Sequence, residues 1–169
     1  MKARKKQDEA LARWLAIPGR LRRAVHGLTK ARLDERLDTE HLSVRETVHH
    51  LVEANLVASN IIIAALADSG SKYDWTWVNP GGSWMKKLGY DRAPVAPAIA
   101  TLSALSRHFA AILAVIPDGL QRTIQLNDAP GAPRYTKTVR QILDDEAGHA
   151  DEHLATLPRR RAATRRARR

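Results

Sequence analysis

Apolar residues return every three or four positions along four stretches of this chain, a spacing that predicts amphipathic helices. The stretches cover about residues 8–28, 43–68, 94–116 and 135–157. The second helix should begin at Ser43, because Glu46 three residues later completes a capping box. Pro18 predicts a kink or a restart in the first helix, and Pro158 should end the fourth. No convincing strand pattern appears, so we expect an all-α protein with a four-helix arrangement.

The connection over residues 70–93 is long and irregular, and it holds three of the four tryptophans. These are Trp75, Trp77 and Trp84. Long loops of this kind often carry function. Two compatible interpretations stay open: the tryptophans form an aromatic plug over one end of the bundle, or they form a wall of a substrate pocket.

Composition restricts the class of protein. A length of 169 residues suits one domain. The chain has no cysteine, which excludes disulfides, cysteine-based zinc sites and a catalytic thiol on the protein. No apolar run approaches the roughly 18 residues of a transmembrane helix, and the N-terminus lacks the apolar core of a signal peptide. We therefore expect a cytoplasmic protein without membrane contact.

The net charge of +10 belongs to the two ends of the chain. Residues 1–6 hold four basic side chains and residues 159–169 hold seven arginines, without an acid in either segment. The body between them has 17 basic and 18 acidic residues, a net charge of −1. We expect one folded domain over residues 7–158 and a disordered arginine-rich tail over residues 159–169. Non-specific nucleic-acid contact through this tail is one interpretation, and a solvated appendage is the other.

Two histidines in the fourth predicted helix, His149 and His153, are four residues apart and therefore share one face. Such a pair can bind one divalent ion if a third ligand is supplied from elsewhere. His50 is the candidate, because its face of the second helix is otherwise small or apolar. Its neighbour His49 shares a face with charged residues and should face solvent. His108 lies off the apolar stripe of the third helix, and we expect it not to be a ligand. The residues alone leave metal binding open against histidines that only form hydrogen bonds.

Three segments of the chain resemble the DinB-like superfamily. They are the run from Pro18 to Thr29, the run Leu-Ser-Val-Arg-Glu-Thr-Val-His-His-Leu that contains His50, and the run from Thr138 to His153. The similarity covers about residues 8–157, and the segment spacing is closest to a branch of bacillithiol-transferase-like metal-dependent hydrolases. The resemblance implies an up-down-down-up four-helix bundle that forms a homodimer. It also implies a divalent ion, zinc or nickel, held by His50, His149 and His153.

The chemistry implied by the resemblance is attack on a small electrophilic substrate by a metal-bound water or a metal-bound low-molecular-weight thiol. Relatives often carry Glu or His five residues after the first ligand, where this chain has Asn55. An acid–base group would then come from elsewhere, with Glu146 and Asp145 as candidates, although carboxylates at such positions are often only solvated. We expect a metal-dependent thiol S-transferase or hydrolase. The alternatives are a non-catalytic, metal-containing, stress-related binding protein and a nucleic-acid-associated protein that acts through its tail.

Overall fold

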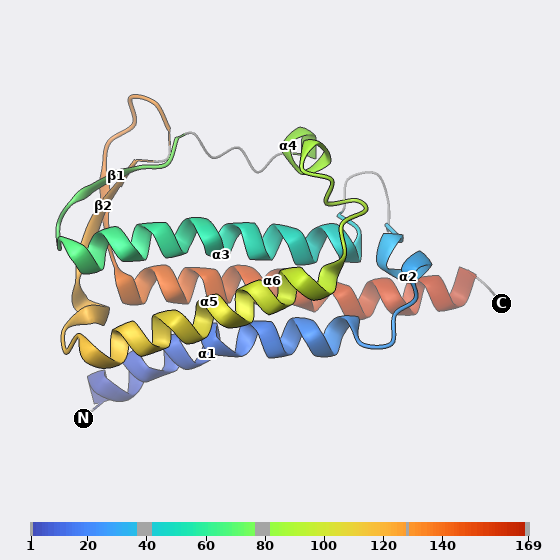
Figure 1. The fold of residues 1–169 in the computed structure, drawn as a ribbon, viewed down its shortest axis with the longest axis horizontal. Coiled ribbons are helices and arrows are strands. Elements are labelled where there is room, and N and C mark those ends of the chain that lie inside the picture. The colour runs from blue at the N-terminus through green and yellow to red at the C-terminus, as the bar shows by residue number, and fades with distance from the viewer. Residues whose placement is uncertain (1, 37–41, 77–81, 128, 168–169) are drawn as a thin grey trace.

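Four long helices form the body of the protein in the computed structural model, which describes residues 2–36, 42–76, 82–127 and 129–167 (Figure 1). The long helices are α1 (Lys2–Val25), α3 (Val44–Ala67), α5 (Val95–Val115) and α6 (Val139–Ala167). The short helices are α2 (Lys30–Asp34), α4 (Gly82–Lys87) and the 3-10 helix η1 (Gly119–Gln121). The strands are β1 (Lys72–Asp74), β2 (Thr123–Asn127) and β3 (Tyr135–Thr138).

The long helices form an up-down-down-up bundle, as predicted. α1 and α6 run in one direction, and α3 and α5 run in the other (Figure 1). α1 packs against α5 and α6, and α3 packs against the same two helices. Because α3 and α5 are parallel neighbours, the chain between them must travel back along the bundle before α5 can begin. This return accounts for the long connection after α3.

The core fills the space between these helices. Trp14, Ile17 and Leu21 of α1 are fully buried, and the Trp14 ring meets Phe109 of α5 edge-on, with 6.2 Å between the ring centroids. Pro18 lies inside α1, and the helix does not restart there. A proline inside a helix removes one backbone hydrogen bond. Burial of the apolar residues on both sides of Pro18 offsets that loss.

A three-stranded sheet caps one end of the bundle, and our expectation of no strands was wrong. β2 lies in the middle, parallel to β1 and antiparallel to β3. β1 follows α3 and β2 follows α5, so both strands leave helices that end at the same end of the bundle (Figure 1). The fourth helix consequently starts at Val139 rather than at Tyr135 or Thr136, which belong to β3. Strands of three to five residues are too short for a recognisable alternation.

The last helix continues further than predicted. α6 passes through Pro158 and includes residues up to Ala167, whereas we expected it to end at Pro158. The division into a domain over residues 7–158 and a disordered tail over residues 159–169 stays a prediction. A separate role for residues 159–169 stays a prediction.

Two of the long helices, α3 and α5, are more apolar than we expected when we found no apolar run of transmembrane length. By length and composition alone, α3 and α5 could each cross a membrane. In the bundle, however, half of the most apolar window of α3 is buried against other helices, as in the core helix of a soluble protein. Packing in the bundle therefore accounts for the composition of α3.

Candidate metal centre

α3 and α6 position the three histidines. The capping box fixes the start of α3: the Glu46 carboxylate accepts from the Ser43 backbone N–H at 2.8 Å, and the Ser43 hydroxyl accepts from the Glu46 N–H at 3.2 Å. His50 follows two turns later. In α6, the residues before and after His149 include the fully buried Ala147 and Ala150, which pack in the core. This packing leaves His149 and His153 on the adjoining face, toward α3.

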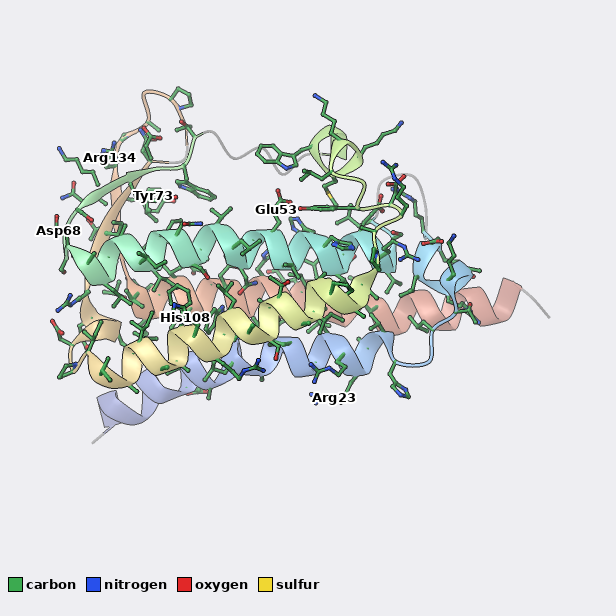
Figure 2. All side chains as sticks on the ribbon, viewed as in Figure 1. Arg23, Glu53, Asp68, Tyr73, His108 and Arg134 are labelled. Carbon is green, nitrogen blue, oxygen red and sulfur yellow. The ribbon has the colours of Figure 1, made fainter. Side chains whose placement is uncertain are left out.

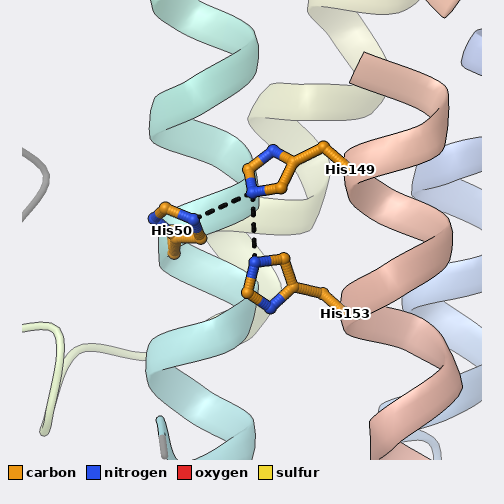
Figure 3. Close-up of side chains that lie close together, drawn as sticks. All are labelled: His50, His149 and His153. Atoms are coloured by element: carbon orange, nitrogen blue, oxygen red, sulfur yellow. Dashed lines mark hydrogen bonds between the residues drawn. The ribbon is translucent and has the colours of Figure 1, made fainter. Parts of the chain in front are cut away.

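The structure brings these three side chains together (Figure 3). The Nε2 atom of His149 lies 3.1 Å from Nε2 of His50 and 3.1 Å from Nε2 of His153. One potential ligand atom from each residue falls within 4.8 Å of the others. Nitrogen ligands about 2.0–2.1 Å from one ion lie roughly 2.9–3.4 Å apart when the ligand angles are near 90° or tetrahedral. The His50–His149 and His149–His153 pairs therefore have the nitrogen spacing that a shared ion requires.

The electrostatics of the cluster also fit a cation. Burial, followed by the charge on neighbouring His149, lowers the pKa of His50 to about 4, so its ring is neutral at pH 7 and keeps a lone pair for a ligand bond. Oε2 of Glu146 lies 4.0 Å from Nδ1 of His149 and is buried without a hydrogen-bond partner in the described chain. Nδ1 of His50 is buried without one as well. A divalent ion would supply the positive charge that this carboxylate lacks. The roles of the three histidines as ligands stay a prediction.

A pocket of about 360 Å³ opens beside the cluster. Its volume lies near the lower limit of the roughly 300–1,000 Å³ typical of small-molecule sites. Residues from α3, α6, the sheet and the segment after β1 line it: His50, Glu53, Ala54, Val57, Ala58, Ile61, Trp75, Leu126, Tyr135, Lys137, Ile142, Asp145, Glu146 and His149. Two members of the histidine cluster, His50 and His149, therefore lie in the wall of a cavity large enough for a substrate.

Glu53 is the pocket residue that our sequence analysis missed as a functional candidate. Figure 2 shows it extending from α3 toward the segment that carries α4. Burial raises the pKa of Glu53, and a hydrogen bond from the Tyr90 hydroxyl partly opposes that rise. Its Oε2 atom is buried without a hydrogen-bond partner among the described residues. A carboxyl group with a raised pKa in a pocket wall is a typical acid–base candidate. Its position three residues after His50, hence on the same side of the helix, was the available signal.

His49 does not face solvent, which corrects our prediction for this residue. Its ring stacks on Tyr90 with 5.0 Å between centroids, and its Nε2 atom lies 3.2 Å from the Ala93 carbonyl oxygen. Two of the charged neighbours that suggested a wet face, Arg45 and Glu46, are themselves buried. Arg45 bonds Asp34 at 2.6 Å and the Ala93 carbonyl at 2.9 Å. Helix α2 and the segment before α5 cover this face. Local periodicity cannot reveal such a cover, because the covering residues come from distant parts of the chain.

Three other residues discussed in the sequence analysis, Asp145, Asn55 and His108, do not belong to the histidine cluster. Asp145 is exposed and forms an ion pair with Lys137, and both line the pocket. Asn55 is not at the site, because it is fully buried in the core and accepts a hydrogen bond from the Trp14 indole at 2.6 Å. His108 is exposed on α5 and is not part of the cluster.

Of the three tryptophans proposed as a pocket wall, Trp75 lines the pocket. Trp84 is half-buried on α4 and does not belong to the lining, and Trp77 lies outside the described residues. Contact of any of them with a substrate stays a prediction.

Comparisons with known proteins identify a family and a solved structure that this chain resembles. No curated protein sequence matches the chain. Among solved structures, the chain is similar to YfiT from Bacillus subtilis, described as "a probable metal-dependent hydrolase with an unusual four-helix bundle topology". The TM-score is 0.80 at 18% identity, covering 94% of this chain and 87% of the other. A sequence model of the DinB superfamily matches residues 13–157. Because this match spans most of the chain, the protein belongs to the DinB superfamily.

Proposed function

We propose that the protein is a metal-dependent enzyme that transfers a group from a small electrophilic substrate to water or to a low-molecular-weight thiol. The observation that supports this proposal best is the convergence of three imidazole nitrogens beside a pocket whose wall includes His50, His149, Glu53 and Glu146. The description of the structurally similar YfiT as "a probable metal-dependent hydrolase" supports the same reaction class.

Each group of residues at the site would have its own role in the reaction. His50, His149 and His153 would hold a divalent ion, zinc or nickel, through neutral nitrogens. Because imidazoles are neutral ligands, such an ion would keep its full charge, and it would lower the pKa of a water or thiol bound to it. Because the chain has no cysteine, a thiol nucleophile would arrive as a cosubstrate.

Glu53 is the residue we assign to proton transfer. Its carboxylate can accept the proton of the attacking water or thiol and return it to the leaving group, since burial places its pKa above the usual range. Tyr90 holds this carboxylate by a hydrogen bond, so it acts as a positioning residue. Glu146 lies beside Nδ1 of His149 and can orient that ring in the same way as the carboxylates found behind metal-bound histidines.

Elemental analysis tests the ion. Wild-type protein supplemented with zinc or nickel should carry about one ion per chain, as a three-histidine site predicts. His153→Ala should lose it, and His108→Ala, which removes an exposed histidine on α5, should keep it. Absence of metal from the wild type under both supplements would reduce the cluster to hydrogen-bonding histidines and overturn the proposal.

Turnover tests the reaction. Metal-loaded protein should hydrolyse an activated ester or consume a thiol together with an alkylating electrophile, and the two assays decide between water and thiol. Glu53→Gln should lower kcat by roughly 10²–10⁴-fold, the usual contribution of a general acid–base group, and should leave the metal content unchanged. Equal turnover in Glu53→Gln and wild type would remove Glu53 from the mechanism.

A further inference from the structure

The pocket beside the histidines is elongated, and its two ends differ in chemistry. The lining residues of α3 run from His50 to Ile61, eleven positions apart. At 1.5 Å of rise per residue they span roughly 16 Å of the helix. α6 contributes from His149 back to Ile142, and because α6 is antiparallel to α3, Ile142 lies at the Ile61 end. His50 and His149 therefore stand at one end of a channel, and aliphatic side chains stand at the other.

The end near the sheet is apolar. Besides Ile61 and Ile142, its wall consists of these residues: Val57, Ala58, Trp75, Leu126 and Tyr135. Ile61, Leu126 and Ile142 also belong to the buried core, so their positions are fixed by packing. The indole N–H of Trp75 has no acceptor among the described residues, which leaves room for one polar atom on an otherwise hydrocarbon ligand.

The charged pair in the lining does not offer a free cation to the ligand. Lys137 forms an ion pair with Asp145 and lies over the Tyr135 ring at 5.7 Å from its centroid. A strongly anionic or sugar-like substrate would lose its hydration at the apolar end and would gain there no free donor beyond the Trp75 indole N–H. A hydrocarbon chain would instead be stabilised by each methylene group that it buries.

We propose that the substrate of this site has a polar reactive group at one end, bound at His50, His149 and His153, and a hydrocarbon tail that lies between α3, α6 and the sheet up to Ile61. This inference rests on the proposed function for the identity of the polar end, whereas the tail site rests on the pocket walls alone.

A series of alkyl hydroxamates of increasing length, from acetohydroxamate to decanohydroxamate, tests the tail site on the zinc-loaded protein. The hydroxamate is a metal-binding head, and the tail is the variable. The dissociation constant, measured by calorimetry, should fall about threefold to fourfold for each added methylene until the chain passes Ile61. A dissociation constant that does not change with chain length, in protein that binds both metal and the short probes, would overturn the tail site and leave the proposed function standing.

A variant that blocks the far half of the channel tests the same proposal. Val57 is half-buried about 10 Å of helix rise from His50, so Val57→Trp should fill the far half of the channel. It should remove the advantage of long chains and leave acetohydroxamate binding unchanged. Leu56→Trp is the control, because Leu56 is on the same helix, is 41% exposed and does not line the pocket. Equal loss in both variants, or no loss in Val57→Trp, would contradict the proposal.

The metal-free protein separates the two proposals. Primary alcohols from butanol to decanol carry no strong metal-binding head, and ligand-observed NMR should detect tighter binding with length in His153→Ala. The same dependence should be absent in the double variant His153→Ala with Val57→Trp. If the protein fails to bind metal but retains this length dependence, the metal-dependent function fails and the tail site stands. Loss of length dependence in the metal-free, folded protein would count against the tail site itself.

Discussion

At the scale of single residues, Asn55 shows how a polar side chain inside the core obtains hydrogen-bond partners for both its nitrogen and its oxygen. Its amide nitrogen donates to the Leu51 carbonyl at 2.8 Å, and its oxygen accepts from Trp14 at 2.6 Å. Asn55→Ala would leave the buried Trp14 N–H without a partner, so we expect a loss of about 1–3 kcal/mol of unfolding free energy. Urea denaturation measures this change.

The matched control for this variant is Asn60→Ala. Asn60 makes the same helical hydrogen bond, to Leu56 at 2.9 Å, but on the surface. Its loss should change stability by less than about 0.5 kcal/mol. Metal content should be unaffected in both variants. Equal losses would show that the bond to Trp14 contributes nothing.

The protonation of His50 predicts the pH dependence of stability in the metal-free protein. The pKa of His50 is about 4 in the folded chain against 6.5 for a free histidine, because of burial and the nearby His149. Between these values the unfolded state binds more protons than the folded state, so stability rises with pH from about 4 to 6.5 and falls as the solution is acidified. Urea denaturation across this range should show a smaller slope in His50→Gln. An identical slope in the variant would contradict the assigned pKa.

At the scale of elements, the capping box of α3 stabilises the start of the helix that carries His50. Ser43→Ala removes the acceptor of the Glu46 N–H and should cost about 1 kcal/mol. Ser43→Thr keeps a hydroxyl and should retain most of that stability. Thermal unfolding compares the two variants. Because α3 is also held by core packing at Leu51 and Ile62, we expect both variants to keep their metal. Equal unfolding temperatures in Ser43→Ala and wild type would mean that the cap is not used.

The short strands decide where the far wall of the pocket stands. β1 pairs with β2 from Lys72 to Asp74. The backbone N–H of Trp75 then donates to the Asn127 carbonyl at 3.1 Å. This pairing places Trp75 beside Leu126 in the pocket lining. The sheet therefore provides a wall that the four helices alone would not supply.

At the scale of the whole molecule, the basic charge is separated from the body that carries the site. Residues 159–169 hold seven arginines, whereas residues 7–158 have a net charge of −1. Deleting residues 159–169 keeps the buried Leu157 and should leave metal content and unfolding temperature unchanged. Any affinity for single-stranded DNA should disappear with the tail. Nucleic-acid binding by the shortened chain, measured by fluorescence anisotropy, would contradict a tail-based interaction. The predicted homodimer, the cytoplasmic location and the choice between zinc and nickel stay predictions.

The four helices and the histidine candidates could be predicted from the sequence because their signals are local. Apolar periodicity, the Ser43–Glu46 box and the i,i+4 spacing of His149 and His153 all lie within single helices. The apolar face around His50 made it the candidate third ligand, and the family resemblance then supplied the direction of the helices and the joint role of the three histidines.

Only the tertiary structure decided the sheet, the burial of His49 and the surroundings of Glu53 in the pocket wall. Each depends on contacts between distant segments: β1 with β2, His49 with Tyr90 and Ala93, and Glu53 with Tyr90. The sequence could place Glu53 near His50 on one helix, but a carboxylate there is ordinary until another segment covers it and raises its pKa. Local pattern thus determined which residues form helices and share faces, whereas the packing of remote segments determined which of those faces are buried and which line the pocket.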